Sequence, residues 1–233
     1  MRIKICGITS KKDLEVCEEK GADLIGFINI ERSKRMVEIE EIKTLLSFMK
    51  DRTKAVIVIE PFNMANAEEK IRKSGITNIQ LHSLSPEEIN ELKEKYYGKN
   101  AENKTQISPN LTITRAVGIS KVIDRDKRRE IENFADICDF LLFDYEIQGK
   151  TGGTGKQIPA KTAIKAAKIA KNRNKNVKLT LAGGMNTARI KNEGKQLEKV
   201  FDAFDINSGV EIKPGVKNID KISELMEIKQ NNQ

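Results

Sequence analysis

The chain has 233 residues, a length at which a barrel of alternating strands and helices forms one domain without a second core. Hydrophobic residues make up 38% of it and charged residues 33%, which supplies a buried core and excludes a largely disordered chain. The formal net charge is +8, but aromatic residues are only 5% and tryptophan is absent, which argues against a stacking surface for single-stranded nucleic acid.

Short apolar runs alternate along the chain with longer segments of helical period. This alternation predicts repeated strand–helix units around a parallel sheet. We expect eight strands: Arg2–Cys6, Asp23–Ile28, Ala55–Ile59, Asn78–Leu81, Ile113–Gly118, Asp139–Phe143, Val177–Ala182 and Phe204–Asn207.

Helical segments lie between these strands. The expected helices include Lys11–Lys20, Ile39–Lys50, Ala65–Ser74, Pro86–Tyr96, Ala160–Lys171 and Ile219–Lys229. Ser85, Pro86 and Glu88 form the pattern of an N-cap, a first-turn proline and a capping-box glutamate. Three helical runs are followed by a glycine that suits a left-handed C-cap, namely Gly21, Gly75 and Gly98.

Eight such units are enough to close a sheet on itself. Closure removes exposed sheet edges, whereas an open doubly wound sheet needs fewer strands and a glycine fingerprint that this sequence lacks. We therefore predict an α/β fold, a single (β/α)₈ TIM barrel over residues 1–233. The polar stretch Lys99–Leu111 is expected to be an extended connection on the face opposite the active site, with a linker between two domains as the alternative.

The positive charge is spread over helix surfaces. Lys161, Lys165, Lys168 and Lys171 recur on the polar side of one predicted helix, as expected of a solvated face. A functional basic patch is the alternative, but we expect no nucleic-acid partner.

Cysteine and apolar content indicate the compartment. Three cysteines without CxxC spacing, and a single histidine, indicate neither a disulfide framework nor a metal site. No apolar run approaches the roughly 18 residues of a membrane span, and the opening MRIKICGI is short and charged. We expect a cytoplasmic protein with no membrane contact, no signal peptide and no metal.

Two reactive side chains follow strands at the edge where barrels of this kind build their active sites. Cys6 ends the first strand next to Gly7, and Asp144 directly follows the sixth. Taken alone, Cys6 is typical of a small buried apolar residue, and Asp144 of a cap or a salt-bridge partner. The loops that follow strands six, seven and eight favour a catalytic role instead.

These three loops are rich in glycine. Consecutive glycines let backbone N–H groups converge on an anion, and the last two of these loops bind phosphate in many barrels. Flexibility explains any one loop, but three in adjacent positions predict a phosphate site. Its expected residues are Gly153, Thr154, Gly155, Gly183, Gly184, Ser208 and Gly209.

Eight short motifs span nearly the whole chain in one order: KICGIT, GADLIGF, SKR, QLH, LLFD, GGTG, LAGG and SGVE. Each is weak alone, but their order and their positions at strand ends resemble the phosphoribosylanthranilate isomerase family of tryptophan biosynthesis. The resemblance implies an Amadori rearrangement, in which N-(5-phosphoribosyl)anthranilate opens its ribose ring and becomes a 1-deoxyribulose phosphate carrying the anthranilate amine.

The resemblance also implies residue roles. It places the general base on Cys6 and the general acid on Asp144, with no cofactor. It matches Arg35 to the arginine that holds the anthranilate carboxylate, a task suited to a planar two-pronged donor. It puts His82 near the substrate, and we expect Asp205 at the barrel mouth; for both, a structural role is an equal alternative.

Three positions depart from the family pattern. Ser83 stands where glycine is common after QLH, Glu60-Pro61 follows the third strand, and Ile158–Ala160 replaces an aromatic and an Asp-Trp pair. These departures concern loop shape rather than the proposed acid and base.

Two other interpretations remain. Another phosphosugar barrel, such as indole-glycerol-phosphate synthase or a ribulose-phosphate epimerase, is disfavoured by the single histidine and by the position of Cys6. A non-catalytic phosphate-ligand or nucleic-acid-binding protein would need neither Cys6 nor Asp144. The expected partner is a small phosphosugar substrate, and the expected assembly is a monomer or a homodimer.

Overall fold

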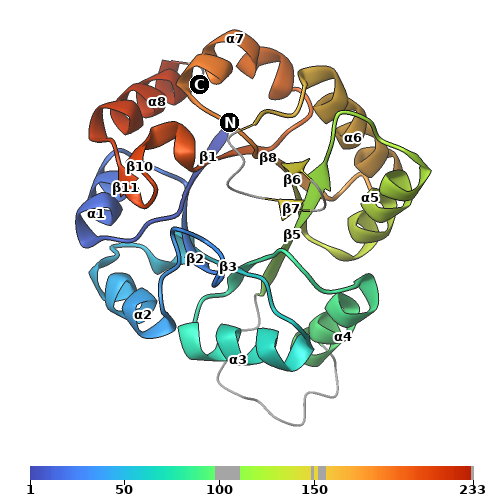
Figure 1. Ribbon diagram of the computed structural model, residues 1–233, viewed down its shortest axis with the longest axis horizontal. Helices are drawn as coiled ribbons and strands as arrows, with labels where there is room; N and C mark the ends of the chain where they lie inside the picture. Colours follow the sequence, from blue (N-terminus) through green and yellow to red (C-terminus); the bar gives the residue numbers. More distant parts are fainter. Residues whose placement is uncertain (98–110, 148–149, 152–155, 232–233) are drawn as a thin grey trace.

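A computed structural model describes residues 1–97, 111–147, 150–151 and 156–231. Eight parallel strands close into a barrel in the order β5-β4-β3-β2-β1-β9-β8-β6, with β6 returning to β5 (Figure 1). The strands are β1 (Arg2–Cys6), β2 (Leu24–Asn29), β3 (Ala55–Ile59), β4 (Asn78–Leu81), β5 (Thr112–Ile119), β6 (Phe140–Ile147), β8 (Lys178–Leu181) and β9 (Ala203–Ile206). The predicted closed barrel is confirmed.

Helices form the outer layer of the barrel in Figure 1. They are α1 (Lys11–Glu19), α2 (Ile39–Phe48), α3 (Met64–Ser74), α4 (Pro86–Tyr97), α5 (Arg125–Ile137), α6 (Ala160–Arg173), α7 (Thr187–Leu197) and α8 (Ile219–Asn231). The smaller elements are η1 (Arg52–Lys54), β7 (Lys150–Thr151), η2 (Ser208–Val210), β10 (Glu211–Lys213) and β11 (Val216–Lys217).

Alternation along the strands explains both layers of the core. In β1, Ile3 and Ile5 are fully buried within the large apolar cluster that also contains helix residues such as Leu14. The residues between them, Lys4 and Cys6, have side chains on the other face of the strand and belong to the barrel interior. Ile3 and Ile5 thus pack β1 against the helices, and Lys4 and Cys6 face the interior of the barrel.

The predicted caps of α4 and α3 are present at the ends of these helices. The Ser85 N–H donates to Glu88 Oε2 at 2.8 Å, and the Glu88 N–H donates to Ser85 Oγ at 3.2 Å, which forms the capping box of α4. Gly75 ends α3 with a φ of +67°, the left-handed conformation expected of a C-cap glycine. Gly98 and residues 99–110, most of the predicted polar connection, lie outside the described residues.

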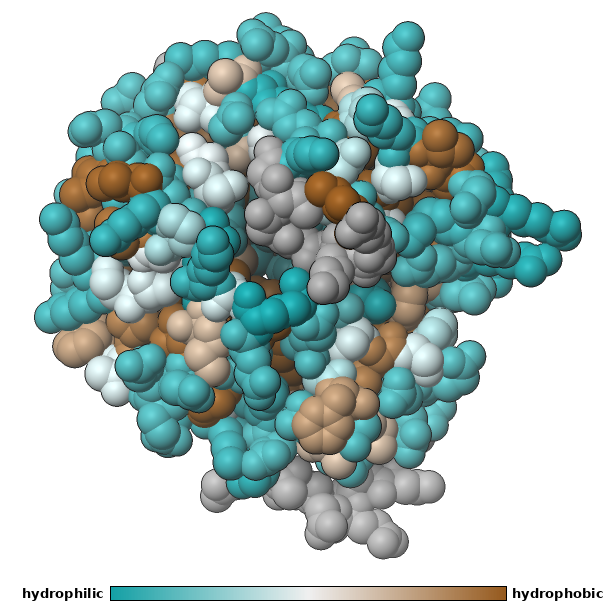
Figure 2. Space-filling view, in the orientation of Figure 1, coloured by the Kyte–Doolittle hydropathy of each residue, from teal (hydrophilic) through white to brown (hydrophobic). Residues whose placement is uncertain are grey.

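The surface around the barrel mouth is mainly hydrophilic, with isolated apolar side chains (Figure 2). Lys161, Lys165 and Lys168 are exposed on α6, which buries alanines and Ile169 on its other side. Across the described part of the chain, every helix is too short or too polar to cross a bilayer.

Candidate active site

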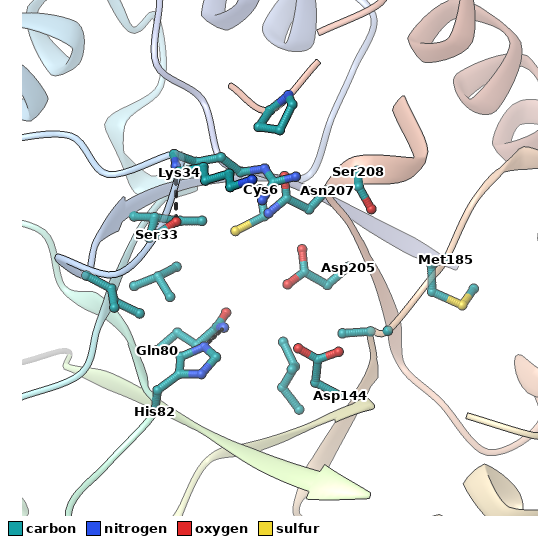
Figure 3. Close-up of a pocket in the computed structure, with 18 of the residues that line it drawn as sticks. Cys6, Ser33, Lys34, Gln80, His82, Asp144, Met185, Asp205, Asn207 and Ser208 are labelled. Carbon is teal, nitrogen blue, oxygen red and sulfur yellow. Dashed lines mark hydrogen bonds between the residues drawn. The ribbon is translucent and has the colours of Figure 1, made fainter. Parts of the chain in front are cut away.

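A cavity of about 370 Å³ opens at the carboxyl ends of the strands. The five residues predicted for catalysis and for contact with the rest of the substrate all line it: Cys6, Arg35, His82, Asp144 and Asp205. Figure 3 shows Cys6 and Asp144 on opposite sides of the cavity, with Asp205 between them. The structure therefore brings together side chains that lie more than 100 residues apart in the sequence.

The thiol of Cys6 has room because of a glycine on the neighbouring strand. Cys6 pairs with Gly26 of β2, and a Cβ atom on Gly26 would lie 2.8 Å from Cys6 Sγ. Directly after Cys6, Gly7 turns the chain with a φ of +75°, in a space where a Cβ would meet Asn207 Oδ1 at 2.7 Å. Gly26 thus leaves space for the thiol, and Gly7 leaves space for the side chains of Asn207 and Arg35 beside it.

A polar network lies beneath Cys6 inside the barrel. Lys4 Nζ donates to Asp205 Oδ2 at 2.9 Å and to Gln80 Oε1 at 2.8 Å, and Gln80 Nε2 lies 3.0 Å from His82 Nε2. Lys4 is only 4% exposed. The other carboxylate oxygen, Asp205 Oδ1, is buried and has no hydrogen-bond partner among the described residues. That acceptor is available to a substrate hydroxyl.

Opposing effects act on the ionisation of Cys6. Burial is the largest effect and raises the pKa of the Cys6 thiol, while the ammonium groups of Lys4 and Lys217 lower it. For Lys4, burial alone would lower the pKa, but Asp205 and Cys6 outweigh it and the pKa is raised. Lys4 therefore stays charged, and its charge favours the thiolate form of Cys6.

His82 is held in its neutral form. Burial, followed by the charge of the Arg115 guanidinium, lowers the pKa of His82 to about 3. A neutral imidazole offers one donor and one acceptor, which suits a hydrogen-bonding role near the substrate and not a proton exchange at neutral pH.

Arg35 is fixed in place by a buried carboxylate. Its Nε and Nη2 donate to Glu211 Oε1 and Oε2 at 2.8 and 2.6 Å, a two-pronged charge-assisted pair. Glu211 also accepts from Lys217 Nζ at 3.0 Å. Arg35 lines the cavity, so a carboxylate entering there meets a guanidinium whose orientation is already set.

Asp144 has different surroundings. It lies in β6 beside Leu142, which belongs to a small apolar cluster with Ala116 and Ala182. The carboxylate is 8% exposed, and its Oδ1 accepts the N–H of the next residue, Tyr145, at 2.7 Å. Its strand and these apolar neighbours thus contribute to placing the carboxylate.

The glycine loops contribute unequally to the predicted phosphate site. Gly183 and Gly184 line the cavity with φ values of +70° and +65°, and Ser208 lines it too. Gly209 lies behind the wall, where a Cβ would be 2.1 Å from Met185 O, so it packs the loops together rather than lining the site. Gly153, Thr154 and Gly155 lie outside the described residues.

Two of the departures from the family pattern contact each other. Ser83 Oγ donates to Pro61 O at 2.5 Å, and Arg32 forms a two-pronged pair with Glu60 at 2.7 and 2.8 Å. These bonds join the loops after β2, β3 and β4 at the rim of the cavity. The unusual loop residues therefore support one another.

Sequence reasoning missed three charged residues beside the cavity, namely Lys4, Glu211 and Lys217. A signal existed for Lys4, because a lysine two residues before Cys6 in the same strand must share its face. For Glu211 and Lys217 the partners lie in other segments. Among the described residues, no group of three or more His, Cys, Asp or Glu side chains could hold a metal.

Comparison with known proteins gives one consistent result. The family model described as N-(5′-phosphoribosyl)anthranilate (PRA) isomerase matches residues 3–228. The chain is 35% identical over 227 residues to the N-(5′-phosphoribosyl)anthranilate isomerase of Methanothermobacter marburgensis, covering 97% of this chain and 93% of that protein. It is 30% identical over 229 residues to that of Staphylococcus aureus strain MRSA252, covering 98% and 96%.

Solved structures share the fold. The phosphoribosyl anthranilate isomerase of Thermus thermophilus superposes with a TM-score of 0.76 at 23% identity, covering 100% of both chains. Another phosphoribosyl anthranilate isomerase, solved in complex with reduced 1-(o-carboxyphenylamino)-1-deoxyribulose 5-phosphate, has a TM-score of 0.72 at 22% identity and covers 99% of both chains.

Proposed function

Because this chain belongs to the N-(5′-phosphoribosyl)anthranilate isomerase family, we propose that Cys6 and Asp144 catalyse the Amadori rearrangement of that substrate. The product is 1-(2-carboxyphenylamino)-1-deoxyribulose 5-phosphate, an intermediate of tryptophan biosynthesis. The observation that carries the residue assignment is the placement of one thiol and one carboxyl on opposite sides of a single cavity (Figure 3).

The reaction needs one acid and one base. Asp144 gives a proton to the ring oxygen as the bond from C1 to that oxygen breaks, and the nitrogen lone pair forms the C1=N iminium. Cys6, as thiolate, takes the proton from C2, and the released electron pair forms the C1=C2 bond while neutralising the nitrogen. The enol-amine then loses its C2 hydroxyl proton and gains a proton at C1, which gives the ketone without net change in atoms.

The charges near Cys6 support its role as base. A thiol is a good proton acceptor only as thiolate, and burial opposes that form. Lys4 and Lys217 lower the pKa that burial raises. The base therefore depends on nearby ammonium groups.

The remaining residues hold the substrate. Arg35 binds the anthranilate carboxylate, the neutral imidazole of His82 contacts the substrate, and Asp205 Oδ1 accepts a sugar hydroxyl. The phosphate binds at the rim against Gly183, Gly184 and Ser208, with Gly209 supporting that wall. Gly153, Thr154 and Gly155, which lie outside the described residues, remain predicted phosphate ligands. Backbone N–H groups at such loops suit a phosphate.

Two further expectations belong to this proposal. A cytoplasmic location would keep the Cys6 thiol reduced. The assembly is a monomer or a homodimer; one related structure is described as that of mutually generated monomers of the dimeric phosphoribosylanthranilate isomerase from Thermotoga maritima. Sedimentation of the purified chain decides between the two.

The test is turnover of freshly prepared N-(5′-phosphoribosyl)anthranilate, followed by loss of its fluorescence. Cys6→Ser and Asp144→Asn should each lower kcat by roughly 10²- to 10⁴-fold, as expected for removal of one proton-transfer group. Cys138→Ala, which removes a buried cysteine that does not line the cavity, is the matched control and should keep its kcat. Near-wild-type kcat in either active-site variant contradicts the assignment of that residue.

A further inference from the structure

A group of buried charges lies behind Cys6, where β1, the loop after β2 and the hairpin β10–β11 meet. Glu211 begins β10 and Lys217 ends β11, and these two residues pair across the hairpin. Their side chains are 4% and 0% exposed. The proton transfers described above use neither of them.

The ammonium group of Lys217 binds the residue that carries the thiol. Its Nζ donates to the main-chain carbonyl of Cys6 at 2.6 Å, to Asn207 Oδ1 at 3.0 Å and to Glu211 Oε1 at 3.0 Å. It also lies 3.3 Å from Asn207 O. Every one of these partners is an acceptor, which matches the three donors of a protonated lysine. Lys217 therefore fixes the end of β1 from behind.

The hairpin is itself tied to the barrel. The backbone N–H of Lys217 donates to Asp13 Oδ2 in α1 at 3.2 Å, and Thr9 Oγ1 donates to the carbonyl of Gly215 in the hairpin turn at 2.6 Å. The position of Lys217 is thus set by the segment that follows Cys6.

Glu211 joins Lys217 to the substrate anchor. Its two oxygens accept from Nε and Nη2 of Arg35, and Oε1 also accepts the Gly215 N–H at 3.2 Å. These bonds occupy one edge of the Arg35 guanidinium. The other edge carries Nη1 and the second Nη2 hydrogen; it has no hydrogen-bond partner among the described residues and can bind a ligand carboxylate.

Burying these three charges needs a reason. Removal of charges from water is costly, and apolar residues of similar volume are often as stable as a buried ion pair. A purely structural role would therefore be filled equally well by an apolar cluster. The charges instead lie between the carboxylate anchor and the base.

We propose that Glu211 and Lys217 are positioning residues that couple Arg35 to Cys6, so that the same charges that orient the carboxylate anchor also hold the base. The inference rests on the proposed function, which gives Arg35 and Cys6 their roles. Glu211 orients the guanidinium, and Lys217 fixes the Cys6 main chain and places a positive charge near its thiol.

The first test distinguishes the effect of Glu211 on Arg35 from the effect of Lys217 on Cys6. In Glu211→Gln the guanidinium loses its charged partner, so KM should rise by more than kcat falls. In Lys217→Met, kcat should fall, and the rising limb of kcat against pH should move to higher pH. The reason is that, at a pH below its pKa, a thiol loses about nine-tenths of its thiolate form when the pKa rises by about one. Lys213→Met, an exposed lysine in the same hairpin, is the control and should match the wild type.

The second test reports on Cys6 without turnover. Iodoacetamide modifies thiolates, and the rate of Cys6 modification can be followed against pH by mass spectrometry. The charged groups facing this thiol are Lys4, Asp205, Lys217 and Arg35. In Lys217→Met the midpoint of modification should move to higher pH, while in the control it stays in place. A merely structural loss of Lys217 would lower the melting temperature without moving that midpoint.

The double variant Glu211→Gln with Lys217→Met removes one charge of each sign and avoids an unpaired buried charge. If a single variant does not fold, the double variant decides: it should show both the higher KM and the shifted midpoint. Where all three fold, the effects on kcat/KM should be non-additive, as expected of contacting residues.

Wild-type KM and an unshifted midpoint in the folded variants would overturn the inference. The proposed function fails separately, when Cys6→Ser keeps its turnover. An inactive Cys6→Ser together with unchanged Glu211 and Lys217 variants rejects only the coupling.

Discussion

The two sides of the cavity place their reactive groups by different means. Around Cys6, charged side chains from β1, β9, β11 and the loop after β2 converge, and Lys4 and Lys217 lower the pKa that burial raises. Around Asp144, the contacts include apolar walls, Gly183 and the N–H of the adjacent residue Tyr145.

This difference fits the two proposed roles, base for Cys6 and acid for Asp144. A base that must lose its proton in a buried site needs positive charge nearby, and that charge comes from residues distant in sequence. Asp144, the proposed acid, lies within β6 and beside an apolar cluster, and both contribute to fixing its position. The comparison predicts that activity responds to changes of charge around Cys6 and to changes of shape around Asp144.

Among changes that keep both Cys6 and Asp144, the largest effect is expected from removing the charge beneath Cys6. Lys4→Met should raise the pKa of the Cys6 thiol, because Lys4 lowers it now. Activity that requires the thiolate rises with pH through that pKa, so the rising limb should move to higher pH. If the pKa rises by about one, activity at neutral pH should fall about tenfold. The measurement is kcat against pH.

Lys4→Met also leaves Asp205 buried without its counter-charge, which costs roughly 3–5 kcal/mol of stability. The double variant Lys4→Met with Asp205→Asn restores charge balance and serves as the control for folding. Asp205 raises the pKa of the Cys6 thiol, so in the double variant the rising limb should move less than in Lys4→Met alone. If the rising limb of kcat against pH stays in place in folded Lys4→Met, the claim that charge controls the Cys6 side of the site is wrong.

A smaller effect is expected from filling the space beside each reactive group. In Gly183→Ala the new Cβ would lie 3.0 Å from Asp144 Oδ1, at a φ of +70°, so the variant should lower kcat and cost roughly 1–3 kcal/mol. In Gly26→Ala the Cβ would lie 2.8 Å from Cys6 Sγ and 3.1 Å from Lys4 Cε.

The two alanine variants sharpen the comparison through their pH profiles. Gly26→Ala displaces both the thiol and its ammonium neighbour, so the rising limb should move as well as kcat fall. Gly183→Ala should lower kcat with the limb unmoved. Identical profiles for the two variants would show that the two sides of the site do not differ in this way.

A still smaller effect concerns His82, whose pKa is lowered to about 3 from its usual 6.5. Between these values the unfolded chain binds a proton that the folded chain does not. This group's contribution to stability is therefore full above pH 6.5 and declines as the pH falls toward 3. Denaturant melts of the wild type and His82→Gln should show the extra loss only in the wild type, and an imidazole that titrates near neutral pH in NMR spectra would contradict it.

The smallest effect is expected far from the cavity. Gly194 lies inside α7, where a Cβ would make ordinary contacts at 3.5 and 3.7 Å, without a left-handed φ. Gly194→Ala should stabilise the fold by roughly 0.5–1 kcal/mol, as for glycine replaced within a helix. Its kinetics should match the wild type, so a lower kcat here would mean that the active-site glycine variants report general damage.

Much of the barrel could be predicted because each strand is short, apolar and followed by a turn signal. The predicted first, third and fourth strands match β1, β3 and β4 residue for residue. Two helices were not assigned, α5 and α7. α5 is dominated by charged residues, and α7 contains Gly194 and few apolar side chains, so neither segment stands out by its apolar content, although Asp124 and Asn186 cap their first turns.

The site was predictable to the extent that it lies at strand ends. Cys6, Asp144, His82 and Asp205 could be placed at the mouth because the strands that carry them are clear. The pairing of Arg35 with Glu211, and of Lys217 with the Cys6 carbonyl, depends on how the hairpin β10–β11 folds back on β1. No local pattern encodes that return, so these contacts required the structure.

The most direct test is a crystal structure of this chain with reduced 1-(o-carboxyphenylamino)-1-deoxyribulose 5-phosphate, which resembles the product. Opening of the ring converts the ring oxygen into the C4 hydroxyl. We expect Cys6 Sγ beside C2, the Asp144 carboxylate within hydrogen-bonding distance of the C4 hydroxyl, and the phosphate against Gly183, Gly184 and Ser208. A ligand with both groups on one side of the sugar, or with its phosphate elsewhere, would contradict the assignment of Cys6 as base and Asp144 as acid.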